Sequence, residues 1–206
     1  MTDGYHDRRA FLGGSLAILL AGCTGLTRGT RRPPAPAPWQ ARQRRLGSLE
    51  RWDLSGRISV IQGEEGWHGS VRWRQTPGGY SIDLVGPLGQ GRIAIDGDAQ
   101  RVRLRTADGR ELTATDADVL LAEVTGLAVP ISGLLYWIRG LPAPTPPSAD
   151  LVGDEEGRLT QLQQGGWSID FNRYTEIDDL QLPARINARQ DGLQVKLAIN
   201  AWEIAA

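Results

Sequence analysis

Apolar and polar side chains alternate along much of the chain beyond residue 51, with the period of two that is typical of β-strands with one buried face. Stretches with this alternation lie at 52–60, 67–74, 80–84, 93–95, 101–105, 158–164, 167–174, 184–190 and 193–202. Glycine, aspartate and proline separate them, as at Asp191 and Gly192, which form the turn signal of the last hairpin. The pattern predicts an antiparallel meander that forms a strongly curved sheet or a barrel.

Helical spacing replaces this alternation in three segments. The first is 39–49. The second is 116–126, where Thr115 or Asp116 can cap the N-terminus and Gly126 can end the helix. The apolar residues of this second segment are Val119, Leu120 and Val124.

The third helical segment runs from Ser132, the expected N-cap, to Gly140, the expected stop. Its side chains are apolar over most of the circumference, which implies burial on more than one side. The pattern therefore predicts a mainly β fold with inserted helices, in which an open barrel is lidded or filled by helices. Such a barrel can hold an apolar ligand cavity, or the same residues can close a solid core, and both alternatives fit the pattern.

The first 22 residues have the pattern of a signal peptide. Arg8 and Arg9 precede an apolar run at 11–20 that is too short to span a bilayer. The motif LAGC follows and ends at Cys23, the only cysteine of the chain, in the arrangement of a bacterial lipobox. We expect Cys23 to be lipidated; the alternative is a plain signal peptide beside an incidental cysteine.

Residues 23–38 are expected to be a lipidated N-terminus and a tether rich in proline and arginine. The four prolines in this segment favour an extended polyproline II backbone. The chain thus divides into a signal peptide (1–22), this tether (23–38) and a single domain (39–206). Because stable anchoring takes more than one acyl chain, a lipidated Cys23 would hold the domain at a membrane without a transmembrane helix. We expect no cofactor apart from this covalent lipid.

Charge and composition exclude several classes of function. A formal net charge of −1 gives no electrostatic reason to expect a nucleic-acid partner. One cysteine excludes an internal disulfide, and with His6 and His68 as the only histidines we expect no metal site. The acidic runs at 153–157 and 176–179 lack a matching base and are interpreted as solvated turns. We therefore expect no enzyme, although an envelope hydrolase is an alternative.

The motif GPLG places an apolar side chain in a turn between two strands. Pro87 suits position i+1 of a type I turn, Leu88 then occupies i+2, and Gly89 is favoured at i+3. A side chain at i+2 of a tight turn points away from the sheet faces, so we expect Leu88 to be exposed. The alternative is a leucine folded back into neighbouring loops.

Several short motifs occur through the domain, and their order along the chain is similar to that of a known protein family. They are GRISV at 56–60, SVRWRQ at 70–75, GPLGQG at 86–91, DADVLLAEVTG at 116–126, YWIRGLPAP at 136–144, GW at 166–167, LP at 182–183 and LAINAW at 197–202. Behind a lipobox, this order resembles the LolB family of outer-membrane lipoprotein receptors. The resemblance implies an unclosed antiparallel β-barrel of about eleven strands, plugged or lidded by helices around a hydrophobic cavity.

The resemblance also implies a function. Proteins of this family accept lipoproteins from a soluble periplasmic carrier of similar fold and insert them into the inner leaflet of the outer membrane, where the receptor itself is anchored and faces the periplasm. The implied partners are that carrier, cargo lipoproteins and outer-membrane phospholipid, and we expect a monomer. Thr24, where the inner-membrane retention signal has aspartate, agrees with this location. Alternatives are a carrier of other amphiphiles and a purely structural scaffold with a solid core.

Site residues follow from the same resemblance. The family has a protruding loop leucine that acts in delivery to the membrane, which Leu88 matches, so Pro87, Leu88 and Gly89 are the expected insertion loop. The candidates for lining an acyl-chain cavity are Trp52, Ile58, Val60, Val71, Trp73, Tyr80, Ile82, Leu84, Ile93, Leu135, Trp137, Ile138 and Trp167. Each of these can equally be ordinary core. Arg139 is interpreted as a cap on helix carbonyls, with contact to the polar end of a bound lipoprotein as the alternative.

Overall fold

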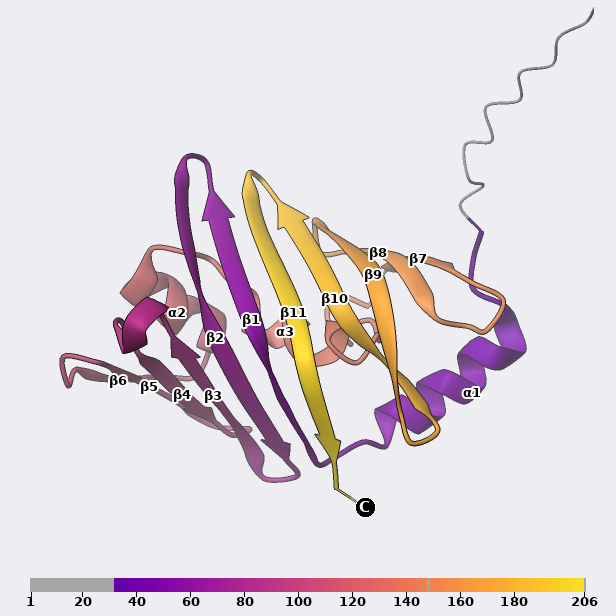
Figure 1. The fold of residues 1–206 in the computed structure, drawn as a ribbon, viewed down its shortest axis with the longest axis horizontal. Helices are drawn as coiled ribbons and strands as arrows, with labels where there is room; N and C mark the ends of the chain where they lie inside the picture. Colours follow the sequence, from indigo (N-terminus) through magenta and orange to yellow (C-terminus); the bar gives the residue numbers. More distant parts are fainter. Residues whose placement is uncertain (1–31, 148, 206) are drawn as a thin grey trace, which may run out of the picture. The chain divides into compact units, whose positions relative to one another are not determined.

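Eleven antiparallel strands form one sheet in the computed structural model, which describes residues 32–147 and 149–205 (Figure 1). The strands are β1 Trp52–Gln62, β2 Glu65–Thr76, β3 Gly79–Val85, β4 Ile93–Gly97, β5 Val102–Thr106, β6 Glu111–Ala114, β7 Ala149–Gly153, β8 Leu159–Gln164, β9 Trp167–Ile177, β10 Leu180–Gln190 and β11 Leu193–Ile204. The predicted signal peptide and Cys23 lie outside the described residues. The body from residue 32 onward is a single structural unit.

The sheet does not close on itself. Its strand order is β6-β5-β4-β3-β2-β1-β11-β10-β9-β8-β7, so β6 and β7 are edge strands that do not pair with each other in the described parts of the chain. The first and last strands, β1 and β11, meet in its centre. The predicted unclosed antiparallel sheet of about eleven strands is therefore confirmed, and the central strands alternate between core and solvent as the sequence pattern indicated.

The alternating sequence pattern did not predict two of the strands, β6 and β7. The edge strand β7 has no buried side chain. The short strand β6 has only two half-buried side chains, Leu112 and Ala114, on its inward side. Because alternation in hydrophobicity arises from burial of one face, edge strands with little burial show almost none of it.

The helix α1, Pro36–Gly47, begins three residues before the predicted start. Proline is well accommodated in a first helical turn, because its missing N–H would have no partner there. Upstream of α1, the carbonyl of Arg32 accepts a hydrogen bond from the amide of Gly153 at 3.0 Å, and Pro34 is buried. The boundary predicted at residue 39 therefore falls inside α1, and residues 32–38 belong to the folded body.

The helix α2, Ala117–Thr125, has the predicted ends. The carboxylate of Asp116 accepts hydrogen bonds from the amides of Asp118 and Val119 at 2.8 and 3.2 Å, and Gly126 ends the helix with φ 74°. The predicted apolar face needs correction at one residue: Val119 is 61% exposed, whereas Leu121 is buried. Helical spacing alone left open which of these two side chains meets the sheet.

The helix α3, Ile131–Trp137, starts one residue before Ser132, so the predicted N-cap is wrong. Ser132 lies inside the first turn, where its amide donates to the Asp118 carboxylate at 2.9 Å and its hydroxyl donates to the same carboxylate. A side chain from α2 thus satisfies the N-terminal amide that a local cap would have served. This clamp joins α2 to α3.

Both inserted helices lie on one face of the sheet, and α3 is behind the central strands in Figure 1. Arg139 follows α3 and is buried. Its Nε donates to the carbonyl of Leu135 at 3.2 Å, and its Nη1 donates to the carbonyls of Leu46 and Leu49 at 3.1 and 3.3 Å. The predicted capping role is confirmed, and the same guanidinium also ties the end of α1 to α3. Among the described residues, no helix combines the length and the apolar character needed to cross a bilayer.

Gly56 lies at a β-bulge between β1 and β11, where the backbones approach closely. A Cβ at this position would lie 2.2 Å from the carbonyl oxygen of Ala198, so we expect Gly56→Ala to lower the free energy of unfolding by about 1–3 kcal/mol. Urea denaturation measures this change. The matched control is Gly47→Ala, because Gly47 ends α1 and a Cβ added there would meet no other atom within 4 Å. Equal stability of the two variants would contradict the expected clash.

Candidate functional site

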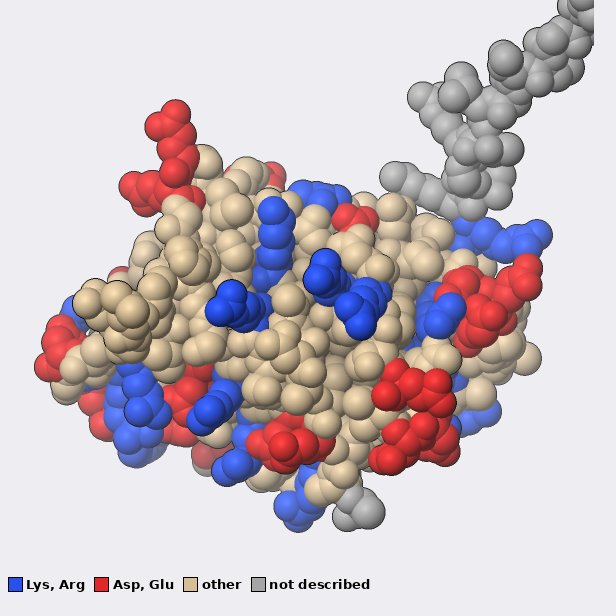
Figure 2. Space-filling model, in the orientation of Figure 1, with Lys and Arg blue, Asp and Glu red and all other residues tan. Residues whose placement is uncertain are grey.

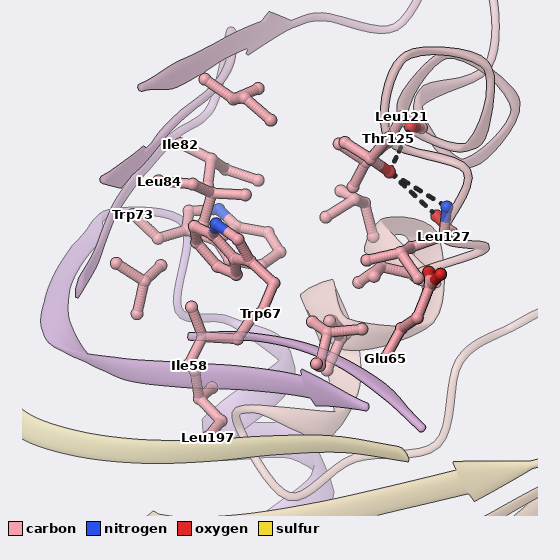
Figure 3. Close-up of a pocket in the computed structure, with 17 residues that line it drawn as sticks. Ile58, Glu65, Trp67, Trp73, Ile82, Leu84, Leu121, Thr125, Leu127 and Leu197 are labelled. Carbon is pink, nitrogen blue, oxygen red and sulfur yellow. Dashed lines mark hydrogen bonds between the residues drawn. The ribbon is translucent and has the colours of Figure 1, made fainter. Parts of the chain in front are cut away.

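An apolar cavity of about 270 Å³ lies between the sheet and the inserted helices (Figure 3). Strands β1 to β4 and β11 form one wall, and α2, the α2–α3 loop and α3 form the other. The residues that line it are Ile58, Val60, Glu65, Gly66, Trp67, Val71, Trp73, Ile82, Leu84, Ile93, Leu121, Thr125, Leu127, Val129, Ile131, Leu134 and Leu197. Of the two predicted alternatives, cavity or solid core, the structure has the cavity.

The strand wall is a direct result of the alternating pattern. Ile58 and Val60 on β1, and Val71 and Trp73 on β2, are each two residues apart and therefore point to the same face. Ile82 on β3 lies opposite Trp73 in the register, which continues the apolar surface onto the next strand. Figure 3 shows Ile58, Trp73 and Ile82 on the opposite side of the cavity from Leu121, Thr125 and Leu127.

Polar atoms in the wall are few. The hydroxyl of Thr125 donates to the carbonyl of Leu121 at 2.7 Å and accepts from the amide of Leu127 at 3.1 Å, so the helical wall satisfies it internally. Glu65 is exposed, at the start of β2. The indole N–H of Trp73 is buried and has no hydrogen-bond acceptor among the described residues. The cavity therefore suits an apolar ligand.

Seven of the thirteen predicted lining candidates lie in the cavity wall: Ile58, Val60, Val71, Trp73, Ile82, Leu84 and Ile93. The other six, Trp52, Tyr80, Leu135, Trp137, Ile138 and Trp167, do not line it. These seven candidates all come from β1 to β4. Of the other six, Trp52 and Tyr80 lie on β1 and β3 as well, and the remaining four lie in or after α3 or on β9.

Aromatic packing explains where several of the six lie. Trp52 packs edge-on against Trp202, with ring centroids 5.5 Å apart. Trp137 packs against Trp167 at 5.8 Å, and its indole N–H donates to Gln164 at 3.1 Å. These rings pack between α3 and the strands β1, β11 and β9, where their buried area stabilises a solid core.

Tyr80 packs against Trp73, with centroids 6.2 Å apart, but stays outside the cavity wall. Burial raises the pKa of Tyr80 to about 12, and the negative charges of Asp118 and Asp116 add to this shift. The phenol is therefore neutral at physiological pH.

Residues of the helical wall were absent from the predicted set. Leu121, Leu127, Val129, Ile131 and Leu134 all line the cavity. A usable signal was the apolar run at 127–131, which is too hydrophobic for a solvated connection between two helices.

Leu88 lies in a 3₁₀ turn, Pro87–Gly89, and is 97% exposed, which confirms the predicted exposure. The predicted type I turn is wrong. Leu88 has φ 57° and ψ 21°, in the left-handed region, and the amide of Gly89 donates to the carbonyl of Gly86 at 3.2 Å. A non-glycine residue in this region costs about 1–2 kcal/mol, so the turn holds a large apolar side chain in water at a backbone cost as well.

Trp67 lies between this turn and the cavity. Its side chain lines the cavity, and a Cβ on Gly86 would lie 3.6 Å from the Trp67 Nε1 atom, so the indole is next to the base of the turn. The amide of Gly86 donates to the carbonyl of Gln90 at 3.0 Å and closes the loop there. The exposed leucine and the apolar cavity are therefore adjacent parts of one region.

These features define a class: open antiparallel barrels whose helices enclose an apolar cavity. A family model described as "Outer membrane lipoprotein LolB" matches residues 50–202. The chain is 38% identical over 187 residues to an outer-membrane lipoprotein LolB of Nitrosococcus oceani, covering 91% of this chain and 93% of that protein. It is 35% identical over 197 residues to the Pseudomonas aeruginosa protein of the same name, with coverages of 95% and 96%. The chain therefore belongs to the LolB family of outer-membrane lipoproteins.

Solved structures show the same fold at low sequence identity. A LolA superfamily protein from Nitrosomonas europaea superimposes with a TM-score of 0.51 at 8% identity, covering 82% of this chain and 94% of that chain. A DUF1329 family protein from Desulfovibrio piger gives a TM-score of 0.50, also at 8% identity, with coverages of 85% and 95%.

Proposed function

We propose that this protein accepts lipoproteins from a soluble periplasmic carrier, holds their acyl chains in the cavity between sheet and helices, and delivers them to the inner leaflet of the outer membrane. The observation that carries the proposal is the apolar cavity, which lies beside an exposed leucine turn. Membership of the LolB family supports it. In this role no covalent bond forms or breaks.

The free energy of exposing acyl chains explains why such a protein is needed. Each methylene group contributes about 0.8 kcal/mol when buried, so a chain of about fifteen methylenes would lose about 12 kcal/mol in water. A shielded route between two apolar environments avoids that barrier. The wall of leucine, isoleucine, valine and tryptophan side chains provides such an environment.

The cavity must enlarge to hold several acyl chains. Its volume of about 270 Å³ is below the roughly 300–1,000 Å³ of pockets for drug-sized ligands. The helical wall can move as a unit, because Asp118 of α2 holds Ser132 of α3. We therefore place the opening at α2 and the start of α3, while Arg139 fixes the other end of α3 to α1.

Three further assignments complete the proposal. Cys23 carries the lipid that anchors the protein, and the segment between Cys23 and Arg32 is the tether that links this anchor to the folded body. Leu88, with Pro87 and Gly89, is the loop that enters the bilayer during delivery. The carrier has the same class of fold, which the likeness to a LolA superfamily protein supports.

A cavity-filling substitution tests the proposal. We expect Ile93→Trp, which places a larger side chain in the cavity wall, to lower acceptance of a triacylated lipoprotein from its carrier at least several-fold. Acceptance is measured as transfer between the two purified proteins without membranes. The matched control is Leu112→Trp on β6, because Leu112 is also half-buried but does not line the cavity. Undiminished acceptance by a folded Ile93→Trp protein would contradict the proposal.

A further inference from the structure

Four cationic side chains lie on the face of the sheet that α2 and α3 leave uncovered. They are Arg57 on β1, Lys196 on β11, Arg185 on β10 and Arg173 on β9, and we call them the basic band. All four are exposed, and Arg57, Lys196 and Arg185 each have neighbours in the strand that point into the core. Figure 2 shows blue side chains across the middle of this face, with red side chains mainly toward its edges.

The strand register brings these residues together. Arg57 and Arg185 each lie opposite Ala198 of β11, one from either side. Arg185 also lies opposite Arg173 of β9, and Lys196 is two residues from Ala198 on the same face of β11. Four strands thus present one cation each around the small side chain of Ala198.

The basic band differs from several other arginines in or beside the sheet in its lack of counter-charges. Arg74, Arg92 and Arg105 form ion pairs with Asp53, Asp83 and Asp96 at 2.8, 2.6 and 2.8 Å. Within residues 32–147 and 149–205, no ion pair involves a member of the basic band. Asp170 lies in the same cross-strand row as Lys196 and Asn187, but its carboxylate already pairs with Arg189 at 2.6 Å.

This concentration of charge is unfavourable for the isolated protein. Like charges directly opposite each other on neighbouring strands, such as Arg185 and Arg173, destabilise a sheet. The chain as a whole has a formal net charge of −1, so the band is a local feature and not a result of a basic protein. An anionic partner would relieve the repulsion.

Two hollows connect the band with the leucine turn. One, of about 620 Å³, is lined by Arg57, Ala198, Pro87 and Leu88 among others. The second, of about 370 Å³, is lined by Arg173, Arg185 and again Ala198. Because the two hollows share Ala198, the surface continues from the exposed leucine to the cations.

We propose that the basic band binds the phosphate groups of anionic phospholipids at the bilayer surface while Leu88 enters the apolar layer. The inference rests on the proposed delivery role of Leu88. It is carried by the continuity of the two hollows, which presents an apolar side chain and several unpaired cations on one side of the molecule. Lipid bilayers offer this combination of an anionic surface above an apolar layer. The band thereby orients the protein on the membrane for delivery.

A vesicle-binding measurement tests the band apart from the lipid anchor. The mature chain from residue 23, carrying Cys23→Ser, is mixed with vesicles of phosphatidylcholine alone or with added phosphatidylglycerol. We expect binding to increase with phosphatidylglycerol and to weaken with salt. The triple variant Arg57→Gln, Arg185→Gln, Lys196→Gln should lose about a hundredfold in affinity for the anionic vesicles, because each of the three cations near such a surface contributes about fivefold.

The matched control is the triple variant Arg74→Gln, Arg92→Gln, Arg105→Gln, which changes the net charge equally but removes ion-paired residues. It should bind the anionic vesicles like the wild type. Equal losses in both variants, or no loss in the band variant, would overturn the proposal.

Transfer from the carrier, measured without membranes, separates a lipid partner from a protein partner. The band variant should accept lipoproteins normally. Impaired acceptance with intact vesicle binding would make the band a docking surface for an acidic protein and overturn the lipid assignment. Failure of the wild type to accept lipoproteins would contradict the proposed function. The vesicle-binding comparison tests the basic band independently of that result.

Discussion

Replacing Leu88 with glutamate should leave acceptance of a lipoprotein from the carrier unchanged and lower its delivery to a bilayer by about ten- to a hundredfold. Burial of a leucine side chain contributes about 1.5–3 kcal/mol, and a tenfold change corresponds to about 1.4 kcal/mol. A carboxylate would in addition resist entry into the apolar layer. Because Leu88 is 97% exposed, the protein should remain as stable as the wild type. The measurement is release of bound lipoprotein into liposomes.

Two further variants make the Leu88 result specific. Val119→Glu introduces the same charge at the other large apolar side chain that is exposed in the described residues, and it should deliver normally. Leu88→Gly removes the side chain while suiting the backbone conformation with φ 57°, so it should fold well and still deliver poorly. Normal delivery by both Leu88 variants would exclude the assigned role.

Replacing Arg139 with alanine should lower the free energy of unfolding by about 3 kcal/mol. The guanidinium donates to three carbonyls, those of Leu135, Leu46 and Leu49, and its loss removes three hydrogen bonds to a charged group from a mostly buried site. Burial lowers the pKa of Arg139, and the nearby Tyr136 opposes this shift. Urea denaturation, followed by tryptophan fluorescence, measures the change.

Arg92→Ala is the control for Arg139, because Arg92 forms a solvent-exposed ion pair with Asp83. Such pairs contribute about 0–1 kcal/mol, so the control should change stability little. A similar small effect of Arg139→Ala would mean that water or neighbouring side chains satisfy the three carbonyls.

Much of the fold follows from local signals. Alternation located nine strands, because each of them buries one face, and Asp116 and Gly126 marked both ends of α2. The error at the start of α3 comes from a contact between residues distant in the sequence. Ser132 looks like an N-cap, but the side chain that serves the amide of Ser132 comes from Asp118, fourteen residues earlier. No local rule contains that contact.

The candidate site was predictable on one side only. Period-two alternation fixes which face of a strand is apolar, so the wall formed by Ile58, Val71 and Ile82 could be expected. The sequence does not say which part of that apolar face meets a cavity and which meets other side chains. Trp73 and Trp52 have the same pattern, yet Trp73 lines the cavity and Trp52 packs against Trp202.

The left-handed backbone at Leu88 restricts which side chains the turn can carry. Branching at Cβ is strongly disfavoured at positive φ, so isoleucine and valine would distort the turn although they are as apolar as leucine. An unbranched Cβ, as in leucine, methionine or phenylalanine, combines apolar character with a tolerable backbone cost. In the proposed role, backbone geometry and lipid chemistry together select the residue at this position, and hydrophobicity alone is not a sufficient criterion for replacing it.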